Sequence, residues 1–199
     1  SVTFSLDLDG NDFITCPSWN KANDSKRKVI EINPGQAFGV GTHESTDLAV
    51  SLLEKHLKNY EKDINILDVG TGTSILSISA AKLDFNHILA IDISEDAIRT
   101  ARENIEINNV KNKIALQNRN IINGVKGEYE VVFANLLADI IDKVLGDIVK
   151  YTKDGALIIL SGIIEKEFSE IINLANSLSL KLIDSERKGE WVSCVLKKG

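Results

Sequence analysis

The sequence predicts an α/β fold in which helices cover both faces of a doubly wound, mostly parallel sheet of seven strands. From about residue 44 onward, short apolar runs alternate with segments of helical periodicity, which is typical of parallel strand–helix units. The run 64–69 leads directly into Gly70-Thr71-Gly72, a glycine turn at the end of a strand. Near the C-terminus, two apolar runs are separated only by a short polar connection, which predicts an antiparallel pair.

The first 32 residues predict a short β-rich lead-in, and residues 33–199 predict the main domain. Residues 2–8 alternate between apolar and polar side chains, as a half-buried strand does. Asp9-Gly10 is a hairpin-turn dipeptide, and 13–16 is the expected returning strand. Residues 29–32 are a third expected strand, which ends at the turn signal Asn33-Pro34-Gly35.

The main domain is expected to begin with a helix and then to alternate strands with helices. The leucines that recur at helical spacing after residue 44 are Leu48, Leu52, Leu53 and Leu57. The expected strands are 64–69, 87–92, 114–117, 130–135 and 156–161, followed by the antiparallel pair 180–183 and 191–196. The expected helices between them are 74–83, 94–108, 137–151 and 164–177, with Ser94 as an N-cap.

The composition is that of an ordinary globular domain with an excess of acidic residues. Hydrophobic residues make up 43% and charged residues 26% of the chain, the net charge is −6 and the pI is near 5.2. This charge disfavours a broad nucleic-acid surface and suits a basic partner. The sequence has neither an apolar run of about 20 residues nor a signal segment, so we expect a cytoplasmic protein that does not span a membrane. The histidines and cysteines lack metal-ligand spacing, so no metal is expected.

The glycine turn and a second acid at a strand end predict a nucleoside site. Gly70 and Gly72 allow the backbone to approach a ligand closely. Asp92 ends the next strand, where a carboxylate can accept hydrogen bonds from both ribose hydroxyls. The dinucleotide fingerprint has a third glycine where this chain has Ile75, so a nicotinamide cofactor is disfavoured.

The pattern Asp68-x-Gly70-x-Gly72 resembles the first motif of class I methyltransferases, which use S-adenosylmethionine. The resemblance implies that Gly70 and Gly72 let the loop pass beneath the methionine part of the cofactor. It also implies that Asp68 orients the cofactor's amino group through water or backbone, and that Asp92 binds the ribose. The family commonly has a third glycine at the position of Ser74, where a serine is expected to narrow the turn or cap the next helix.

A second glycine-rich segment narrows the resemblance to one family. Residues 33–46 read N-P-G-Q-A-F-G-V-G-T-H-E-S-T, similar to the D-P-G-x-A-F-G-T-G-x-H-x-T-T signature of ribosomal protein methyltransferases of the PrmA type. The departures are Asn33, Val40 and Ser45. Asn135-Leu136-Leu137-Ala138 resembles the family's N-I-L-A motif, and 160–163 and 190–192 also match, so the resemblance covers roughly residues 13–197.

The resemblance assigns roles to further residues. Thr46 would bind the cofactor carboxylate from the start of its helix, where the helix dipole favours an anion. Asn135 would contact the cofactor and act as the catalytic residue by accepting a hydrogen bond from the substrate amine, together with the backbone at Leu136. Phe38 is a candidate for the wall of the substrate channel, and His43 is a candidate for relaying a proton or shaping the loop.

The implied activity is that of a protein N-methyltransferase acting on lysine or α-amino groups of a ribosomal protein, the eleventh of the large subunit. The family's N-terminal substrate-recognition domain is expected to be missing from this chain, through truncation or in a naturally short relative. Two alternatives stay open: a small-molecule methyltransferase of the same fold, and a non-catalytic module that binds S-adenosylmethionine. A nucleic-acid methyltransferase is less favoured, because no Pro-Pro-aromatic sequence follows Asn135.

Overall fold

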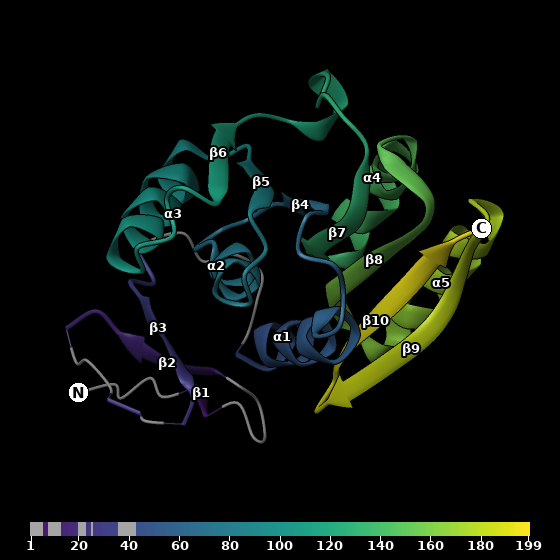
Figure 1. Ribbon diagram of the computed structural model, residues 1–199. Helices are drawn as coiled ribbons and strands as arrows, with labels where there is room; N and C mark the ends of the chain where they lie inside the picture. The colour runs from purple at the N-terminus through teal and green to yellow at the C-terminus, as the bar shows by residue number, and fades with distance from the viewer. Residues whose placement is uncertain (1–5, 8–12, 20–22, 25, 36–42) are drawn as a thin grey trace.

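A computed structural model describes residues 6–7, 13–19, 23–24, 26–35 and 43–199, and these residues confirm the predicted fold class. The main sheet has the strand order β6-β5-β4-β7-β8-β10-β9 (Figure 1). Five neighbouring strands are parallel, and β10 runs antiparallel to both β8 and β9. The strands are β4 (Asn65–Val69), β5 (His87–Asp92), β6 (Ile114–Asn118), β7 (Tyr129–Asn135), β8 (Thr152–Ile164), β9 (Leu180–Lys188) and β10 (Trp191–Lys198).

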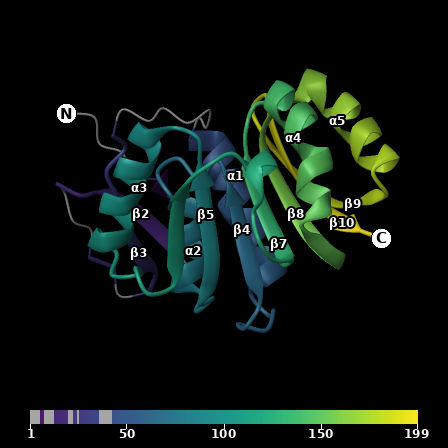
Figure 2. The ribbon, with the colours of Figure 1, turned by 90° about the horizontal axis from the view of Figure 1, so that it is seen from above.

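Helices cover both faces of this sheet, because successive strand residues point to opposite sides. The helices are α1 (His43–Leu57), α2 (Ile75–Lys82), α3 (Glu95–Ile107), α4 (Ala138–Lys150) and α5 (Glu165–Ser177), and a short 3₁₀ helix, η1, spans Ile121–Asn123. Val131 and Phe133 of β7 join the cluster formed with α1 and α2, whereas Val132 and Ala134 join the cluster formed with α4 and α5. Figure 2 shows α4 and α5 side by side over β7 and β8.

Two strands, β8 and β9, are longer than the sequence predicted by more than two residues. β8 begins at Thr152 and not near 156, because a register shift opposite Tyr129–Val131 accommodates Gly155 at φ 78°. β9 continues to Lys188 through a polar segment that its hydrophobicity did not indicate as strand. As the last strand of the sheet, β9 has one edge open to water, where polar side chains are tolerated.

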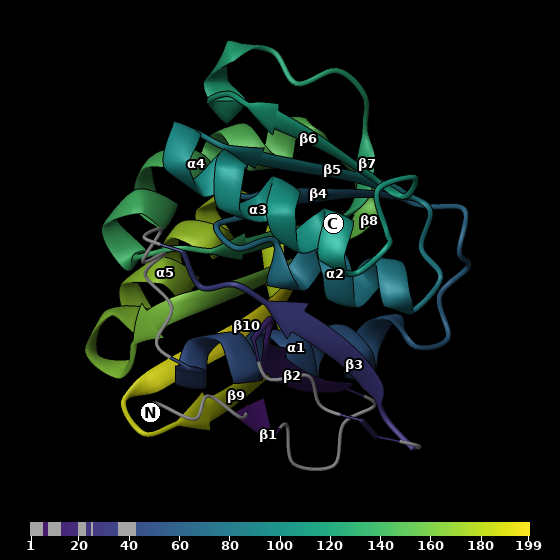
Figure 3. The same cartoon turned by 90° about the vertical axis from the view of Figure 1, so that its left-hand side faces the viewer.

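The lead-in forms a second, three-stranded sheet of β1 (Leu6–Asp7), β2 (Phe13–Pro17) and β3 (Lys28–Ile32). β1 and β2 pair antiparallel, as expected, although the predicted turn at Asp9-Gly10 lies outside the described residues. β3 pairs with β2 in parallel and lies against α2 and α3 (Figure 3). Phe13 and Ile30 are fully buried in the cluster that contains α1 and α2, so this small sheet packs on the main one.

No helix within the described part of the chain is both long and apolar enough to traverse a bilayer. The described residues also contain no group of three or more His, Cys, Asp or Glu side chains arranged to hold a metal ion. Both cysteines, Cys16 and Cys194, are buried and unbridged.

Candidate functional site

Polar residues from distant parts of the chain meet at the carboxyl edge of the parallel strands. The last residues of β4, β5 and β7 lie at this edge because the three strands run in the same direction. Asn135 at the end of β7 is paired in register with Ser161 of β8. In open α/β sheets, ligands bind at this edge, near the point where the strand order reverses. Here that point lies between β4 and β7.

The glycine loop after β4 adopts three left-handed conformations in five residues. The φ angles are 67° at Gly70, 56° at Gly72 and 68° at Ser74. The Thr71 amide donates to Ile91 O at 2.9 Å, and the Ser74 amide donates to Thr71 O at 2.8 Å. The left-handed conformation costs a residue with a β-carbon roughly 1–2 kcal/mol, so Ser74 is a strained position.

The expected helix cap at Ser74 is wrong. Ser74 occupies the N-cap position of α2, yet its side chain makes no cap hydrogen bond to the described helix. The side chain is fully buried instead, and its hydroxyl lies 3.2 Å from the Thr71 hydroxyl. A serine caps a helix from an extended conformation, which Ser94 adopts at the start of α3, where it accepts from the Ala97 amide as predicted. The left-handed backbone of Ser74 turns its side chain away from α2.

The two glycines differ in what surrounds them. A β-carbon on Gly70 would lie 2.5 Å from Cδ2 of Leu136, so glycine lets the segment after β7 pack directly on the loop. A β-carbon on Gly72 would meet only Gly70 O, at 4.0 Å, among the described atoms. The space beside Gly72 is therefore open to a ligand, and Leu136 borders the loop from the side of β7.

Asp68 lies beneath the glycine loop and ties it to α2. Its Oδ2 accepts hydrogen bonds from the Thr71 hydroxyl at 2.7 Å and from the Ser77 hydroxyl at 2.6 Å. Burial raises the pKa of Asp68 to about 6, because desolvation outweighs the two hydroxyl donors and nearby Asp92 adds repulsion. Thr71 and Ser77 were not among the residues predicted for the site, although hydroxyl side chains three and nine residues after the acid of β4 are visible in the sequence.

Replacing Asp68 with asparagine should therefore change how stability depends on pH. The folded pKa of about 6 lies above the ordinary value of 3.8, so the folded state binds its proton more tightly than the unfolded state. Wild-type stability then falls as pH rises from about 4 to 6 and stays constant above. The variant lacks this pH dependence. The difference between its unfolding free energy and that of wild type should therefore shift in favour of Asp68→Asn by up to about 3 kcal/mol as pH rises from about 4 to 7. Urea unfolding at several pH values measures this gain, and parallel curves would contradict it.

Asp92 connects the end of β5 to the glycine loop. Its Oδ2 accepts from the Gly72 amide at 3.0 Å, and its Oδ1 accepts from the Ser94 amide at 2.9 Å. The next side chain, Ile93, is 74% exposed, although Ile is among the residue types most often buried. Ile93 was not among the residues predicted for the site, although an apolar residue between a strand-end acid and a helix N-cap is a signal visible in the sequence. The carboxylate thus lies next to the open side of Gly72, and the exposed Ile93 side chain follows it in the chain.

Asn135 is held between β7 and β8. The Leu136 amide donates to Ser161 O at 3.0 Å, which fixes the backbone just after Asn135. Gly162 has φ 87°, and a β-carbon there would lie 2.7 Å from Leu136 O and 3.1 Å from Oδ1 of Asn135. That Oδ1 atom is buried and has no hydrogen-bond partner among the described residues. Leaving a buried acceptor unpaired costs about 1–3 kcal/mol, so this atom is suited to receive a donor from a ligand.

The start of α1 is attached to the same edge of the sheet. The Ser161 hydroxyl donates to Ser45 O at 2.6 Å, and Lys188 of β9 donates to Asp47 at 2.8 Å. Thr46 lies in the first turn of α1, as predicted, and is partly exposed. The structure thus brings the first turn of α1, the glycine loop, Asp92 and Asn135 to one edge, where the sequence predicted a common site.

Two candidates are not placed by the structure. Phe38 lies outside the described residues. His43 is the first residue of α1, but its side chain is not among those described.

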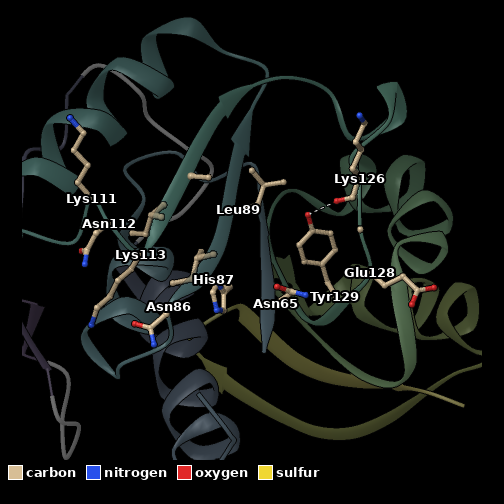
Figure 4. A pocket seen from close by; sticks show the side chains of 14 residues that line it. Asn65, Asn86, His87, Leu89, Lys111, Asn112, Lys113, Lys126, Glu128 and Tyr129 are labelled. Atoms are coloured by element: carbon tan, nitrogen blue, oxygen red, sulfur yellow. Dashed lines mark hydrogen bonds between the residues drawn. The ribbon is translucent and has the colours of Figure 1, made fainter. Parts of the chain in front are cut away.

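A separate hollow of about 550 Å³ lies at the opposite edge of the sheet (Figure 4). The first residues of β4, β5, β6 and β7 line it. Two of its lining side chains have partners: His87 lies 2.9 Å from Asp63, and Lys113 donates to Ala81 O at 3.0 Å. The hollow does not include the strand-end acids or the glycine loop, so the candidate site is the carboxyl edge.

Comparison of the sequence with known protein families identifies the family to which the chain belongs. The model of the family described as ribosomal protein L11 methyltransferase (PrmA) matches residues 9–199. The chain belongs to the PrmA family. Curated PrmA relatives include ribosomal protein L11 methyltransferases from Caldicellulosiruptor saccharolyticus, 37% identical over 93% of this chain, and from Ruminiclostridium cellulolyticum, 38% identical over 91%. The chain spans 60% and 57% of the lengths of these relatives.

Solved structures agree with the PrmA assignment. A ribosomal protein L11 methylase from Lactobacillus delbrueckii subsp. bulgaricus is 28% identical and superposes with a TM-score of 0.89, covering 98% of this chain and 99% of that one. A precorrin-6y C5,15-methyltransferase from Geobacter metallireducens shares the fold, with a TM-score of 0.63 at 15% identity, covering 75% of this chain and 87% of that one. The sheet is therefore that of the Rossmann-like methyltransferases.

Proposed function

We propose that this chain is an S-adenosylmethionine-dependent methyltransferase that transfers a methyl group to a lysine or α-amino group of ribosomal protein L11. The observation that supports it best is the convergence of the glycine loop, Asp92 and Asn135 at one edge of the sheet in a PrmA chain. We further propose that residues 33–199 form the catalytic domain, with the lead-in of 1–32 packed on it, and that the protein works in the cytoplasm.

The chemistry of the site fits this cofactor. The open side of Gly72 accommodates a ligand against the backbone, and Gly70 offers its own backbone. Asp92 keeps unused lone pairs for ribose hydroxyls while it anchors the loop. Ile93 presents an exposed apolar surface beside it, which suits the face of an adenine. Thr46, in the first turn of α1, would donate to a carboxylate where the helix dipole favours an anion.

Two further residues act on the cofactor loop in this proposal. Asp68 holds the loop from below through the Thr71 and Ser77 hydroxyls, and so orients the backbone around the cofactor's amino group. Leu136 packs against Gly70 and closes the loop on the substrate side.

In this proposal, Asn135 orients the substrate amine that accepts the methyl group. When bound, S-adenosylmethionine supplies a methyl group already activated by its sulfonium, so alignment and exclusion of water supply much of the catalysis. A lysine amine, with an ordinary pKa of about 10.4, must lose a proton before it becomes a nucleophile. The buried Oδ1 of Asn135 would accept an N–H of the neutral amine and direct its lone pair. Phe38 remains a candidate for the wall of the channel through which the amine arrives, and His43 remains a candidate for relaying a proton or shaping the loop.

The proposed partner, ribosomal protein L11, is inferred from the names of the relatives and from the net charge of the chain. Relatives carry the name ribosomal protein L11 methyltransferase, and the net charge of −6 suits a basic substrate.

Incubation with tritiated S-adenosylmethionine tests this function. Purified L11, a cell lysate and the lysate's small-molecule fraction serve as acceptors. The Asp92→Ala variant, whose cofactor binding should be weakened, serves as the low-activity control at a limiting concentration of cofactor. We expect label in L11, and hydrolysis should release it as methylated lysine or a methylated α-amine. Label confined to small molecules would replace the proposal with a small-molecule methyltransferase. Cofactor binding without transfer to any fraction would leave a binding module.

A further inference from the structure

Two buried asparagines, Asn104 in the last turn of α3 and Asn108 just after it, face β3 and the residue that follows it. Asn104 and Asn108 are 0% and 6% exposed. Asparagine is usually exposed, so two buried carboxamides on one helix require partners. Both find them in the segment that leaves the small sheet, more than 70 residues earlier in the chain.

Each carboxamide binds one backbone residue as a neighbouring strand would. Asn108 accepts from the Glu31 amide at 2.9 Å and donates to Glu31 O at 2.7 Å. Asn104 accepts from the Asn33 amide at 2.7 Å and donates to Asn33 O at 2.9 Å. The two side chains therefore continue the hydrogen bonding of β3 onto α3.

The second donor of each carboxamide distinguishes the two residues. Asn108 donates to Asn104 O within its own helix, at 2.7 Å. Asn104 donates to Thr73 O of the glycine loop, at 3.0 Å. Of this pair, Asn104 alone connects the residue after β3 to the glycine loop.

The Thr73 carbonyl belongs to a peptide unit that is hydrogen-bonded at both ends. It belongs to the same peptide unit as the Ser74 amide, which donates to Thr71 O at 2.8 Å. Asn104 holds one end of this planar unit and Thr71 holds the other. Rotation of the unit would change the φ angle of Ser74, the strained residue at 68°. The two hydrogen bonds thus offset the cost of a serine where a glycine is the usual choice.

We propose that Asn104 is a positioning residue that holds the Thr73–Ser74 peptide unit, and through it the glycine loop, in its ligand-binding geometry. Asn104 also couples Asn33, the residue that follows β3, to that loop. Its effect on the cofactor rests on the proposed function, whereas its effect on the loop does not.

The matched variants Asn104→Ala and Asn108→Ala test this role. Both remove a buried carboxamide that binds both backbone groups of one residue in β3 or directly after it, so both should lower the melting temperature by a similar amount. Hydrogen exchange of ligand-free protein should be at least about tenfold faster at the amides of 71–74 in Asn104→Ala and unchanged in Asn108→Ala. The KM for S-adenosylmethionine and the Kd for S-adenosylhomocysteine should rise about tenfold only in Asn104→Ala, with kcat within about twofold of wild type.

Equal exchange rates at 71–74 in the two variants would overturn the proposal, as would an unchanged rate in Asn104→Ala. Faster exchange in Asn104→Ala together with a wild-type protein that binds no S-adenosylhomocysteine would support the positioning role and refute the proposed function. Circular dichroism checks that the variants fold. If an alanine variant does not fold, exchange at 71–74 is compared between Asn104→Asp and Asn108→Asp, which leave no cavity.

Discussion

Replacing Asp92 with alanine should weaken cofactor binding about 5- to 150-fold. In the proposed function its carboxylate accepts the ribose hydroxyls, and charge-assisted hydrogen bonds of this kind contribute about 1–3 kcal/mol. The carboxylate also accepts from the Gly72 amide at 3.0 Å, so the substitution removes an anchor of the loop in the same step. Calorimetric titration with S-adenosylhomocysteine measures the change directly.

Asp96→Ala is the matched control for this prediction. Asp96 lies four residues later, in the first turn of α3, and its side chain is 68% exposed and paired with Arg99 on the surface. Removing it changes the net charge by the same amount without touching the loop. An affinity for S-adenosylhomocysteine that is the same in Asp92→Ala, Asp96→Ala and wild type would refute the ribose-binding role.

Replacing Asn135 with alanine should lower turnover by about ten- to a hundredfold while it changes cofactor affinity much less. The proposed acceptor atom, Oδ1, is buried and unpartnered among the described residues, and a hydrogen bond gained there with the substrate amine helps to align the nucleophile. An interaction made chiefly in the transition state reduces kcat when it is lost. Single-turnover methyl transfer at saturating S-adenosylmethionine separates this effect from binding.

Asn86→Ala provides the comparison for Asn135. Asn86 is exposed and lines the hollow at the opposite edge of the sheet, so its removal should leave both turnover and affinity unchanged (Figure 4). A large loss of cofactor affinity with normal turnover in Asn135→Ala would assign Asn135 to cofactor binding alone.

The strand–helix order was readable because periodicity reports on local burial. The runs at 64–69 and 87–92 became β4 and β5 with ends within one residue of the prediction. Boundaries were less readable at β8, where Gly155 continues the strand through a bulge, and at β9, where an open sheet edge permits polar residues. In both cases the outcome depended on a neighbouring strand, which local sequence does not specify.

The sequence by itself determined which side chains stand at the ends of β4, β5 and β7, because strand patterning and parallel topology place Gly70, Asp92 and Asn135 at one edge. Only the tertiary structure decided how that edge is held. The bond from Asn104 to Thr73 joins residues 31 apart, and its bond to Asn33 joins residues 71 apart. Such contacts depend on how elements pack against one another, and the sequence pattern of each element records only whether its faces are buried.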